Sequence, residues 1–358
     1  GSRFGPRGIR QHSLRFGSKG IYDSSLKRDW LTYELQNRRI ADVGDTDVLP
    51  TRVDLTFDGI TNMARHIVGA GALPVVLGGD HAISFPIVRA FTDDLYVIHF
   101  DAHIDYAPFV HGVEMSNSQA FRHIHALPNV KGIMQVGIRG LRNVESWIQD
   151  SVNDGNSVVT TDEYRDIKNY GLMEKIPAGS KVYVSIDIDV LDMSLVPGTV
   201  SAEPNGFLYN ELVATLEAIA QHCEVVGFDL VEVNPQLDVA TGITSYLAAH
   251  TIIDFLGRIC DPQIALALMP LLQDPDADVR RMAAEALGGI GDSNAVEDLT
   301  MALVDEDCTV RAAAERALSL IDPSWPRSEP ARQACRRLEA SMAGQPAWIR
   351  SAIVSARN

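Results

Sequence analysis

The sequence predicts an α/β fold, with a mostly parallel sheet covered by helices on both faces, followed by a small all-α extension. From about residue 60, helical segments alternate with short apolar runs rich in β-branched residues. This alternation is typical of βαβ units, and strands that are apolar throughout are covered on both faces. After Asp261 the strand-like runs stop, and a repeated segment rich in Ala and Leu predicts helices alone.

Six apolar runs are expected to form strands. They read LPVVLGG, LYVIHFD, IMQVGIR, SVVTTDEY, KVYVSIDID and VVGFDLVEV, at residues 73–79, 95–101, 133–139, 157–164, 181–189 and 225–233. Helical patterns are found at residues 57–71, 85–91, 143–152 and 208–222. The sequence therefore predicts one doubly wound α/β domain over residues 1–257.

The helical extension, residues 262–358, contains an internal repeat. The segment DPDADVRRMAAEALGGI from Asp274 matches DEDCTVRAAAERALSLI from Asp305, an offset of 31 residues. Repeated helix pairs are typical of α-solenoids, and these segments resemble HEAT-like repeats. A plain helical extension packed on the α/β domain is the alternative. The prolines of DPSWPRSEP are expected to separate the last repeat from the terminal helix PARQACRRLEASM.

Composition limits the classes of function. The 358 residues carry a formal net charge of −16, which argues against binding to nucleic acid or to an anionic membrane. No apolar run approaches the roughly 20 residues of a membrane span, no signal peptide opens the chain, and the four cysteines lack CxxC spacing. We therefore expect a cytoplasmic enzyme, one whose acidic surface suits a cationic substrate.

Acids and histidines follow three of the predicted strands, in the stretches LGGDH, HFDAHID and SIDID. The six residues are His81, Asp101, His103, Asp105, Asp187 and Asp189. Alternate residues of a strand share a face, and open α/β sheets bind ligands at the carboxyl ends of their strands. A single acid here could merely cap a helix. All six at one sheet edge would repel strongly unless cations neutralise them.

Two divalent ions would balance the charge of the four carboxylates, provided that one or two acids bridge the ions. Two neighbouring divalent ions lower the pKa of a bound water molecule and so generate a hydroxide nucleophile. Oxygen-rich ligation without thiolate favours Mn²⁺, with Co²⁺ or Ni²⁺ as alternatives. The residues alone therefore predict a dinuclear hydrolase site.

The motifs GGDH, DAHID, SIDIDVLD and FDLVEVNPQLD, in this order, resemble the signature set of the ureohydrolase family, the arginases and agmatinases. The resemblance covers roughly residues 3–257 and is closest to the agmatinase branch. It implies a three-layer α/β/α fold, two manganese ions, hydrolysis of a guanidino group to urea and an amine, and a homo-oligomer, either a trimer or a hexamer.

The resemblance also implies a role for each motif residue. One ion would be held by His81, Asp101, Asp105 and Asp187, and the other by Asp101, His103, Asp187 and Asp189. Asp105 is the candidate for passing a proton to the leaving amine. Glu232 matches the glutamate of EVNP, so it would pair with the substrate guanidinium through charge-assisted hydrogen bonds.

The chain departs from the family pattern at the substrate loop. Where family members carry a His-Gly pair, this chain reads MSNSQAF, with Asn117 at the histidine position. His111 could substitute for that histidine, or the proton shuttle could be absent. Family chains also have a strand before RFGPRGIR, so a central strand is expected to be missing or replaced, and the helical repeat is not part of the usual fold.

Agmatine is the favoured substrate, because the agmatinase branch is most similar and no obvious reader of an α-carboxylate is present. Free guanidine is the alternative, because Asn117 and Ser118, together with Ser116 and Gln119, would suit a small polar cation, with Ni²⁺ as a plausible metal.

Two further alternatives stay open. Guanidino acids would require Arg122 or Arg139 to hold their carboxylate. A non-catalytic scaffold that binds protein partners through the helical repeat is the alternative from another class, although the intact ligand set argues against it.

Overall fold

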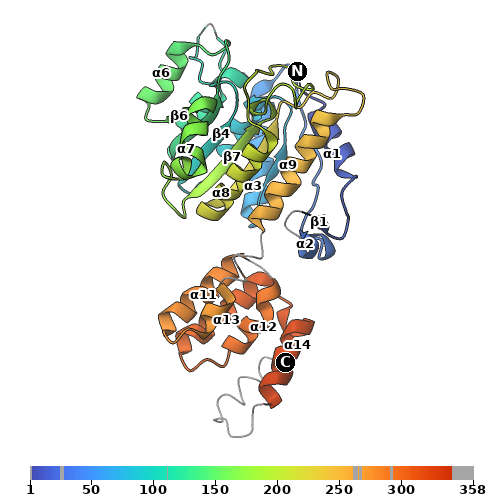
Figure 1. Ribbon diagram of the computed structural model, residues 1–358, viewed down its shortest axis with the longest axis vertical. Helices are drawn as coiled ribbons and strands as arrows, with labels where there is room; N and C mark the ends of the chain where they lie inside the picture. Colours follow the sequence, from blue (N-terminus) through green and yellow to red (C-terminus); the bar gives the residue numbers. More distant parts are fainter. Residues whose placement is uncertain are drawn as a thin grey trace. The chain divides into compact units, whose positions relative to one another are not determined.

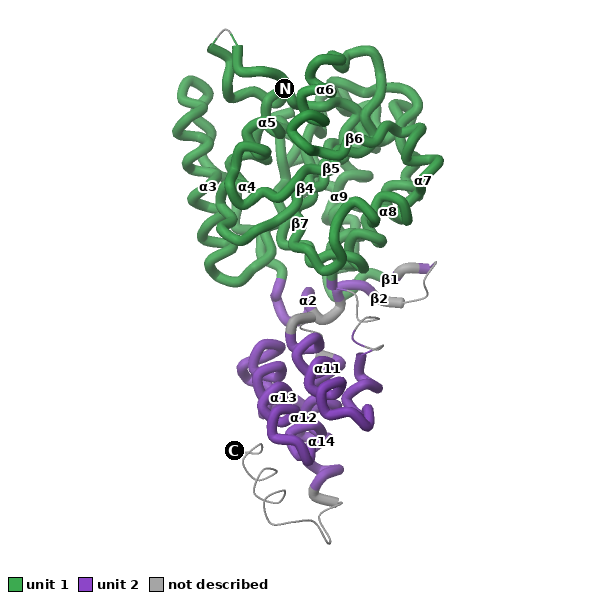
Figure 2. The backbone as a smooth tube through the Cα atoms, turned by 90° about the vertical axis from the view of Figure 1, so that its left-hand side faces the viewer, with its two compact units in different colours: residues 1–21, 40–259 green, residues 22–39, 260–358 purple. Residues whose placement is uncertain are grey.

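The chain forms two compact units (Figures 1 and 2). Unit 1 comprises residues 1–21 and 40–259, and unit 2 comprises residues 22–39 and 260–358. The computed structural model describes residues 2–24, 28–110, 112–260, 265, 268–290 and 293–340. The predicted α/β fold is confirmed in unit 1, and the predicted helical region is confirmed in unit 2.

Unit 1 is built on a parallel sheet of six strands in the order β3-β8-β7-β4-β5-β6. The strands are β3 (Val75–Leu77), β4 (Leu95–Phe100), β5 (Val130–Ile138), β6 (Ser157–Thr160), β7 (Lys181–Asp187) and β8 (Glu224–Val231). Each predicted strand is therefore present. Within the described residues β8 is the only partner of β3, so the sheet ends there.

Helices cover both faces of this sheet because the strands alternate their side chains between two cores. In β4, Ile98 and Phe100 point into one core, and Leu95 and Val97 point into the other. The first core includes α1 (Gly5–Ser13), α7 (Thr161–Met173), α8 (Tyr209–His222) and α9 (Ile243–Ile259). The second includes α3 (Val53–Gly69), α4 (Ser84–Val88), α5 (Ala120–His125) and α6 (Glu145–Asn153). The architecture is three-layered (Figure 1).

The prediction of a strand over residues 157–164 was wrong in its second half. Strand β6 ends at Thr160, and α7 begins at Thr161. Thr160 and Glu163 form a capping box, in which the Thr160 hydroxyl accepts from the Glu163 backbone N–H and the Glu163 carboxylate accepts from the Thr160 N–H. This exchange satisfies N–H groups that the first helical turn leaves unpaired, so the helix starts there.

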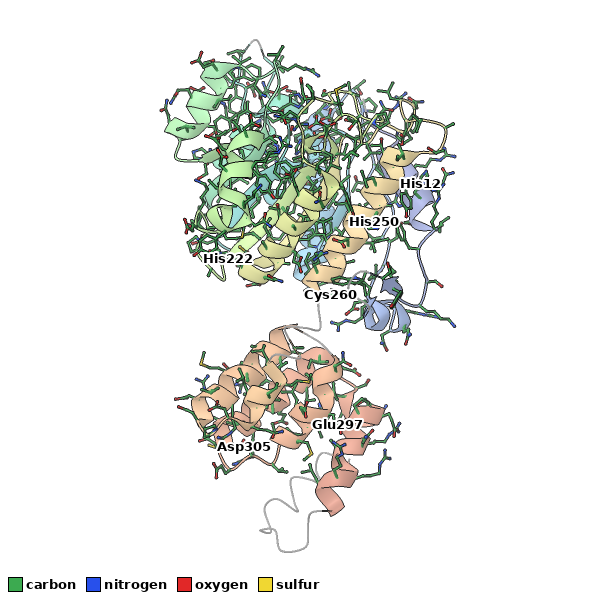
Figure 3. All side chains as sticks on the ribbon, in the orientation of Figure 1. His12, His222, His250, Cys260, Glu297 and Asp305 are labelled. Atoms are coloured by element: carbon green, nitrogen blue, oxygen red, sulfur yellow. The ribbon has the colours of Figure 1, made fainter. Side chains whose placement is uncertain are left out.

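Among its described residues, unit 2 has four longer helices, and equivalent contacts in its two repeats can be compared. The helices are α11 (Ala277–Ile290), α12 (Val296–Ala302), α13 (Cys308–Ile321) and α14 (Glu329–Ala340). Arg280 donates to the carbonyl of Asp274 at 2.8 Å, and Arg311 donates to the carbonyl of Asp305, which is labelled in Figure 3, at 2.7 Å. The two repeats thus place equivalent arginines on equivalent carbonyls.

The remaining elements are short. They are β1 (Ile21–Asp23), β2 (Arg28–Trp30) and α2 (Thr32–Gln36), with 3₁₀ turns at Met269–Gln273, Ser293–Ala295 and Trp325–Arg327. The last of these turns lies in the proline-rich break that the sequence predicts between α13 and α14. Within the described part of the chain, the helices are too short or too polar to cross a membrane.

Candidate metal centre

The sheet order brings the predicted motifs to one edge. Strands β8, β7 and β4 are neighbours; β7 ends at Asp187, and Glu232 and Asp101 directly follow the last residues of β8 and β4. His81 opens a 3₁₀ turn, His81–Ile83, after β3. Gly78, directly after β3, has no room for a side chain, because a Cβ there would collide with the side chain of Val231. The glycine therefore lets the loop after β3 pass closely over β8 and deliver His81 to this edge.

Three carboxylates are anchored through one oxygen each by a backbone N–H. The Oδ1 atom of Asp101 accepts from His103 at 2.6 Å, that of Asp187 from Asp189 at 2.9 Å, and that of Asp189 from Ala102 at 3.1 Å. This anchoring fixes each carboxylate while its second oxygen faces an imidazole.

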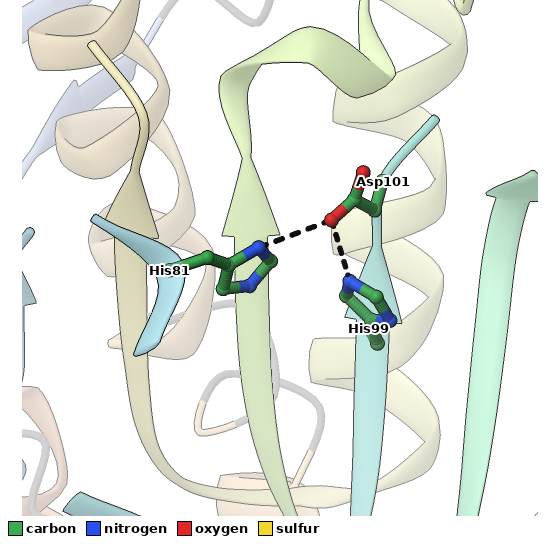
Figure 4. A group of neighbouring side chains, drawn as sticks. All are labelled: His81, His99 and Asp101. Atoms are coloured by element: carbon green, nitrogen blue, oxygen red, sulfur yellow. Dashed lines mark hydrogen bonds and ion pairs between the residues drawn. The ribbon is translucent and has the colours of Figure 1, made fainter. Parts of the chain in front are cut away.

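His81 faces three carboxylates. Its Nδ1 atom lies 3.0 Å from Asp101 Oδ2, 3.3 Å from Asp187 Oδ2 and 3.5 Å from Asp105 Oδ2. The ring is completely buried, and Nδ1 has no hydrogen-bond partner among the described residues; its contact with Asp101, marked in Figure 4, has the geometry of an ion pair. A buried nitrogen without a partner is costly, and a nitrogen facing three oxygens matches the donor set of a divalent cation.

His103 forms a second group. Its Nδ1 atom lies 3.2 Å from Asp101 Oδ1 and 3.1 Å from Asp189 Oδ2, and its Nε2 atom lies 4.0 Å from Oε1 of Glu203. Within the described residues, His103 Nε2 and Asp189 Oδ2 are buried without hydrogen-bond partners. Asp101 thus faces both imidazoles with different oxygens, as a bridging carboxylate would.

The opposite side of the His81 ring fixes its tautomer. The Nε2 atom lies 2.9 Å from Ser185 Oγ, and Ser185 donates its own proton to Asp229 at 2.7 Å. Ser185 must then accept from His81, so Nε2 carries the ring proton. In the neutral ring the lone pair of Nδ1 then points at the carboxylates, which is the arrangement that orients a histidine for metal binding.

Ionising all four aspartates at once is energetically unfavourable. Burial raises the pKa of Asp105, Asp187 and Asp189, and the charge of Asp101 raises these pKa values further. Burial also opposes ionisation of Asp101, but the three imidazoles around it outweigh burial and lower its pKa well below the usual range. The sequence-based argument that these acids need cations is therefore supported by their electrostatics.

The pKa values of the histidines shift in opposite directions: those of His103 and His81 rise, and that of His99 falls. Burial alone would lower the pKa of His103, yet its close contacts with the carboxylates of Asp101 and Asp189 raise it to about 11. The neighbouring carboxylates likewise outweigh burial at His81 and raise its pKa well above the usual value. Burial dominates at His99 and lowers its pKa to about 4.

Glu232 lies beside this cluster, and both of its oxygens are engaged. Oε1 accepts from the His81 backbone N–H at 3.0 Å, and Oε2 accepts from the Ser2 hydroxyl at 2.6 Å. Glu232 and Asp105 have φ values of +60° and +43°, which residues other than glycine rarely adopt. Such backbone strain is concentrated at functional sites, because the surrounding structure must hold it in place.

The predicted substrate loop lies nearby, in a 3₁₀ turn over Asn117–Gln119. The Ser118 carbonyl accepts from the Ala107 N–H at 2.7 Å, and the Gln119 amide donates to the carbonyls of Pro108 and Val113. Gln119 therefore shapes the loop. The predicted alternative shuttle, His111, lies outside the described residues.

The two arginines proposed as carboxylate readers are occupied elsewhere. Arg139 donates to five backbone carbonyls, among them those of Asp189 at 2.8 Å and Glu203 at 3.0 Å. Arg122 donates to the carbonyls of Tyr106 and Ala107 and to the Asp150 carboxylate. Both guanidinium groups hold loops around the site.

Sequence reasoning missed the residues that orient the predicted ligands, namely His99, Ser185, Asp229 and Glu203. The signal for His99 was present, because it lies two residues before Asp101 and shares its face of β4. Which atom each of these residues faces depends on strand pairing and loop paths, which the sequence motifs do not specify.

Comparisons with known proteins agree with this geometry. The profile of the arginase family matches residues 1–257, and a HEAT-repeat profile matches residues 239–319. Proclavaminate amidinohydrolase of Streptomyces clavuligerus is 34% identical over 258 residues, 70% of this chain and 80% of the relative. Agmatinase of Bacillus anthracis is 34% identical over 243 residues, 66% of this chain and 79% of the relative.

A solved structure supports the same assignment. The agmatine ureohydrolase of Thermoplasma volcanium aligns with a TM-score of 0.64 at 25% sequence identity, covering 74% of this chain and 86% of that one. The chain belongs to the arginase family, whose members are hydrolases that act on guanidino C–N bonds.

Proposed function

We propose that this chain is a dinuclear-metal hydrolase that cleaves a guanidino compound to urea and an amine. The observation that carries the proposal is that Nδ1 of buried His81 faces three carboxylate oxygens and has no hydrogen-bond partner among the described residues. One ion would be held by His81, Asp101, Asp105 and Asp187, and the other by Asp101, His103, Asp187 and Asp189. Mn²⁺ is favoured for this oxygen-rich set, and Co²⁺ and Ni²⁺ are the alternatives.

Two bound divalent ions would supply a nucleophile from water and stabilise negative charge. The chain's own residues do the rest. Glu232 offers a carboxylate to the planar guanidinium, which fixes the orientation of the reacting carbon. The Ser2 hydroxyl on Oε2 would have to yield to the substrate. Asp105, at the same edge, would pass a proton to the nitrogen of the leaving amine.

Agmatine is the substrate that we favour. The chain is similar to agmatinases, and both arginines considered as carboxylate readers are committed to backbone carbonyls. A substrate without a carboxylate needs no such reader. Guanidine is the second candidate, because Asn117 stands where the family has a histidine and would present a small polar side chain.

A urea-release screen tests both candidates. The protein would be loaded with Mn²⁺, Co²⁺ or Ni²⁺ in turn and offered agmatine, guanidine, arginine and guanidino acids, and metal content would be measured on the same samples. We expect about two ions per chain and the highest kcat/KM on agmatine. A preference for guanidine with Ni²⁺ would select the second candidate, and two bound ions without urea from any compound would leave the non-catalytic scaffold.

An Asn117→His variant sharpens the choice. If Asn117 excludes the longer substrate or favours the smaller one, restoring the histidine should raise kcat/KM for agmatine relative to guanidine. Ser118→Ala, one residue along the same turn, is the matched control.

The finer expectations on assembly are also proposals. We propose a homo-oligomer, either a trimer or a hexamer, in the cytoplasm, with a possible protein contact through the helical repeat. Light scattering during size-exclusion chromatography measures the assembly, and a monomer at micromolar concentration would contradict it.

A further inference from the structure

His99 is a fully buried histidine that contacts Asp101 of the candidate metal centre. Its Nε2 atom lies 2.8 Å from Oδ2 of Asp101, and its ring stacks on Phe121 with a centroid separation of 3.5 Å. Figure 4 shows His81 and His99 approaching the same oxygen of Asp101 from different directions. By its position alone, His99 could therefore be a metal ligand.

The opposite nitrogen of His99 is engaged by Gln135. His99 on β4 is paired with Gln135 on β5, and Gln135 Nε2 lies 3.0 Å from His99 Nδ1. The same amide group lies 2.7 Å from the carbonyl oxygen of Ile104, and Gln135 Oε1 accepts from the Ser151 hydroxyl at 2.6 Å. All three groups are buried in unit 1.

The Ile104 carbonyl fixes the direction of the hydrogen bonds that link Gln135, His99 and Asp101. A carbonyl oxygen only accepts, so the Gln135 atom facing it must be the NH₂ group. That NH₂ group also faces His99 Nδ1, which must therefore be an unprotonated acceptor. The single ring proton of His99 then lies on Nε2 and is donated to Asp101 Oδ2. With both nitrogens engaged, His99 has no lone pair to offer a metal.

We propose that His99 is a positioning residue that holds Oδ2 of the bridging Asp101 carboxylate toward the His81 side of the centre. The inference rests on the proposed dinuclear site. Oδ1 of Asp101 faces His103 and is anchored by the His103 backbone N–H, which a change at His99 does not remove. Oδ2 faces His81 at 3.0 Å and depends on His99. Loss of His99 should therefore weaken the ion beside His81 more than the ion beside His103.

The test measures metal binding to the full-length protein and does not depend on turnover. In His99→Phe the ring remains stacked on Phe121 and the donor is lost. Isothermal titration with Mn²⁺ should show two sites in the wild type, and one of them should be about 10- to 100-fold weaker in the variant, the usual effect of losing an outer-shell partner. Electron paramagnetic resonance at limiting Mn²⁺ should shift from a spin-coupled to a mononuclear signal.

Conservative variants separate positioning from simple packing. His99→Gln returns an amide donor near the position of Nε2, so it should recover part of the lost affinity. Ser151→Ala removes the hydroxyl that orients Gln135 and should give a smaller loss at the same site. Tyr164→Phe is the matched control, because it deletes a hydroxyl bonded to Thr215 and Asn169 on helices remote from the centre. It should leave both Mn²⁺ affinities unchanged.

Circular dichroism would check that each variant folds. If His99→Phe binds two Mn²⁺ ions with the same affinities as the wild type, the proposal is overturned and the dinuclear centre still stands. If His99→Phe does not fold, an unchanged affinity in Ser151→Ala overturns it. A wild-type protein that takes up fewer than two ions refutes the dinuclear centre itself and, with it, the role of His99.

Discussion

Nδ1 of His81 and Oδ2 of Asp101 lie 3.0 Å apart in a fully buried environment, yet the nitrogen has no hydrogen-bond partner among the described residues. The Nε2 atom on the other side of the ring is held by Ser185, so a neutral His81 presents a lone pair to an oxygen lone pair. Such an approach is repulsive unless a cation or a proton lies between the two atoms.

Replacing the bridging carboxylate should abolish turnover. In Asp101→Asn the side chain keeps its size but loses the negative charge that faces both His81 and His103. We expect a fall in kcat of at least about 100-fold and fewer than two ions per chain. Asp93→Asn is the matched control, because Asp93 is an exposed partner of Lys181. Activity and metal content both near wild type in Asp101→Asn would contradict the bridging role.

Glu232 should affect substrate binding and leave metal binding intact. In Glu232→Gln the charge that would pair with the guanidinium is lost. A hydrogen bond to a charged group contributes about 1.5–3 kcal/mol, so KM should rise by about 10- to 100-fold. Metal stoichiometry should stay at the wild-type value. An unchanged KM would argue against the guanidinium contact.

Ser2→Ala tests the same carboxylate from the other side. Removing the hydroxyl frees Oε2 of Glu232 from its 2.6 Å hydrogen bond. If substrate must displace Ser2, the variant should lower KM modestly, because that displacement no longer opposes binding. A raised KM would instead mean that Ser2 orients the carboxylate for substrate.

The sequence predicted the sheet well because its strands are short, apolar and separated by helices, and all six are present. It also grouped the candidate ligands, because the carboxyl ends of parallel strands lie at one edge. It extended one strand through residues 161–164, although the capping box from Thr160 to Glu163 was readable.

The outer partners of the site were harder to predict, for a physical reason. Gln135 is 36 residues from His99 and reaches it only because β4 and β5 pair in one register. From the sequence, Arg139 could be a carboxylate binder. In the folded chain, however, the loop around Pro204 places carbonyl oxygens against its guanidinium. Tertiary hydrogen bonds of this kind leave no pattern in a single sequence.

Helix packing in unit 2 should tolerate no side chain at Gly288. A Cβ there would lie 2.7 Å from the Cα atom of Ala317 on the facing helix α13. We expect Gly288→Val to lower the free energy of unfolding of this unit by about 1–3 kcal/mol, the usual cost of overpacking. Gly59→Val is the matched control, because nothing lies within 4 Å of a Cβ at Gly59. Urea denaturation measures both, and equal stabilities would contradict the close helix packing.

Metal binding should release protons, because His103 holds one in the metal-free protein. Although burial opposes its charge, close contacts with the carboxylates of Asp101 and Asp189 raise the pKa of His103 to about 11, compared with about 6.5 for an unperturbed histidine. At pH 7.5 the folded, metal-free chain therefore carries this proton, and a cation that takes the place facing the carboxylates must displace it. Titration with Mn²⁺ in buffers of different ionisation enthalpy should detect the release, and the affinity should rise with pH.

The same raised pKa predicts how the metal-free protein responds to pH. A histidine whose pKa is higher in the folded chain contributes its full stabilisation below about pH 6.5, and that contribution is lost as pH rises toward 11. The melting temperature of the metal-free protein should therefore fall between pH 6.5 and 9.5, and that of the Mn²⁺-loaded protein should fall less. If Mn²⁺ binds without releasing protons, the imidazole is neutral before the ion arrives, and the carboxylates do not hold the charge that this geometry assigns to them.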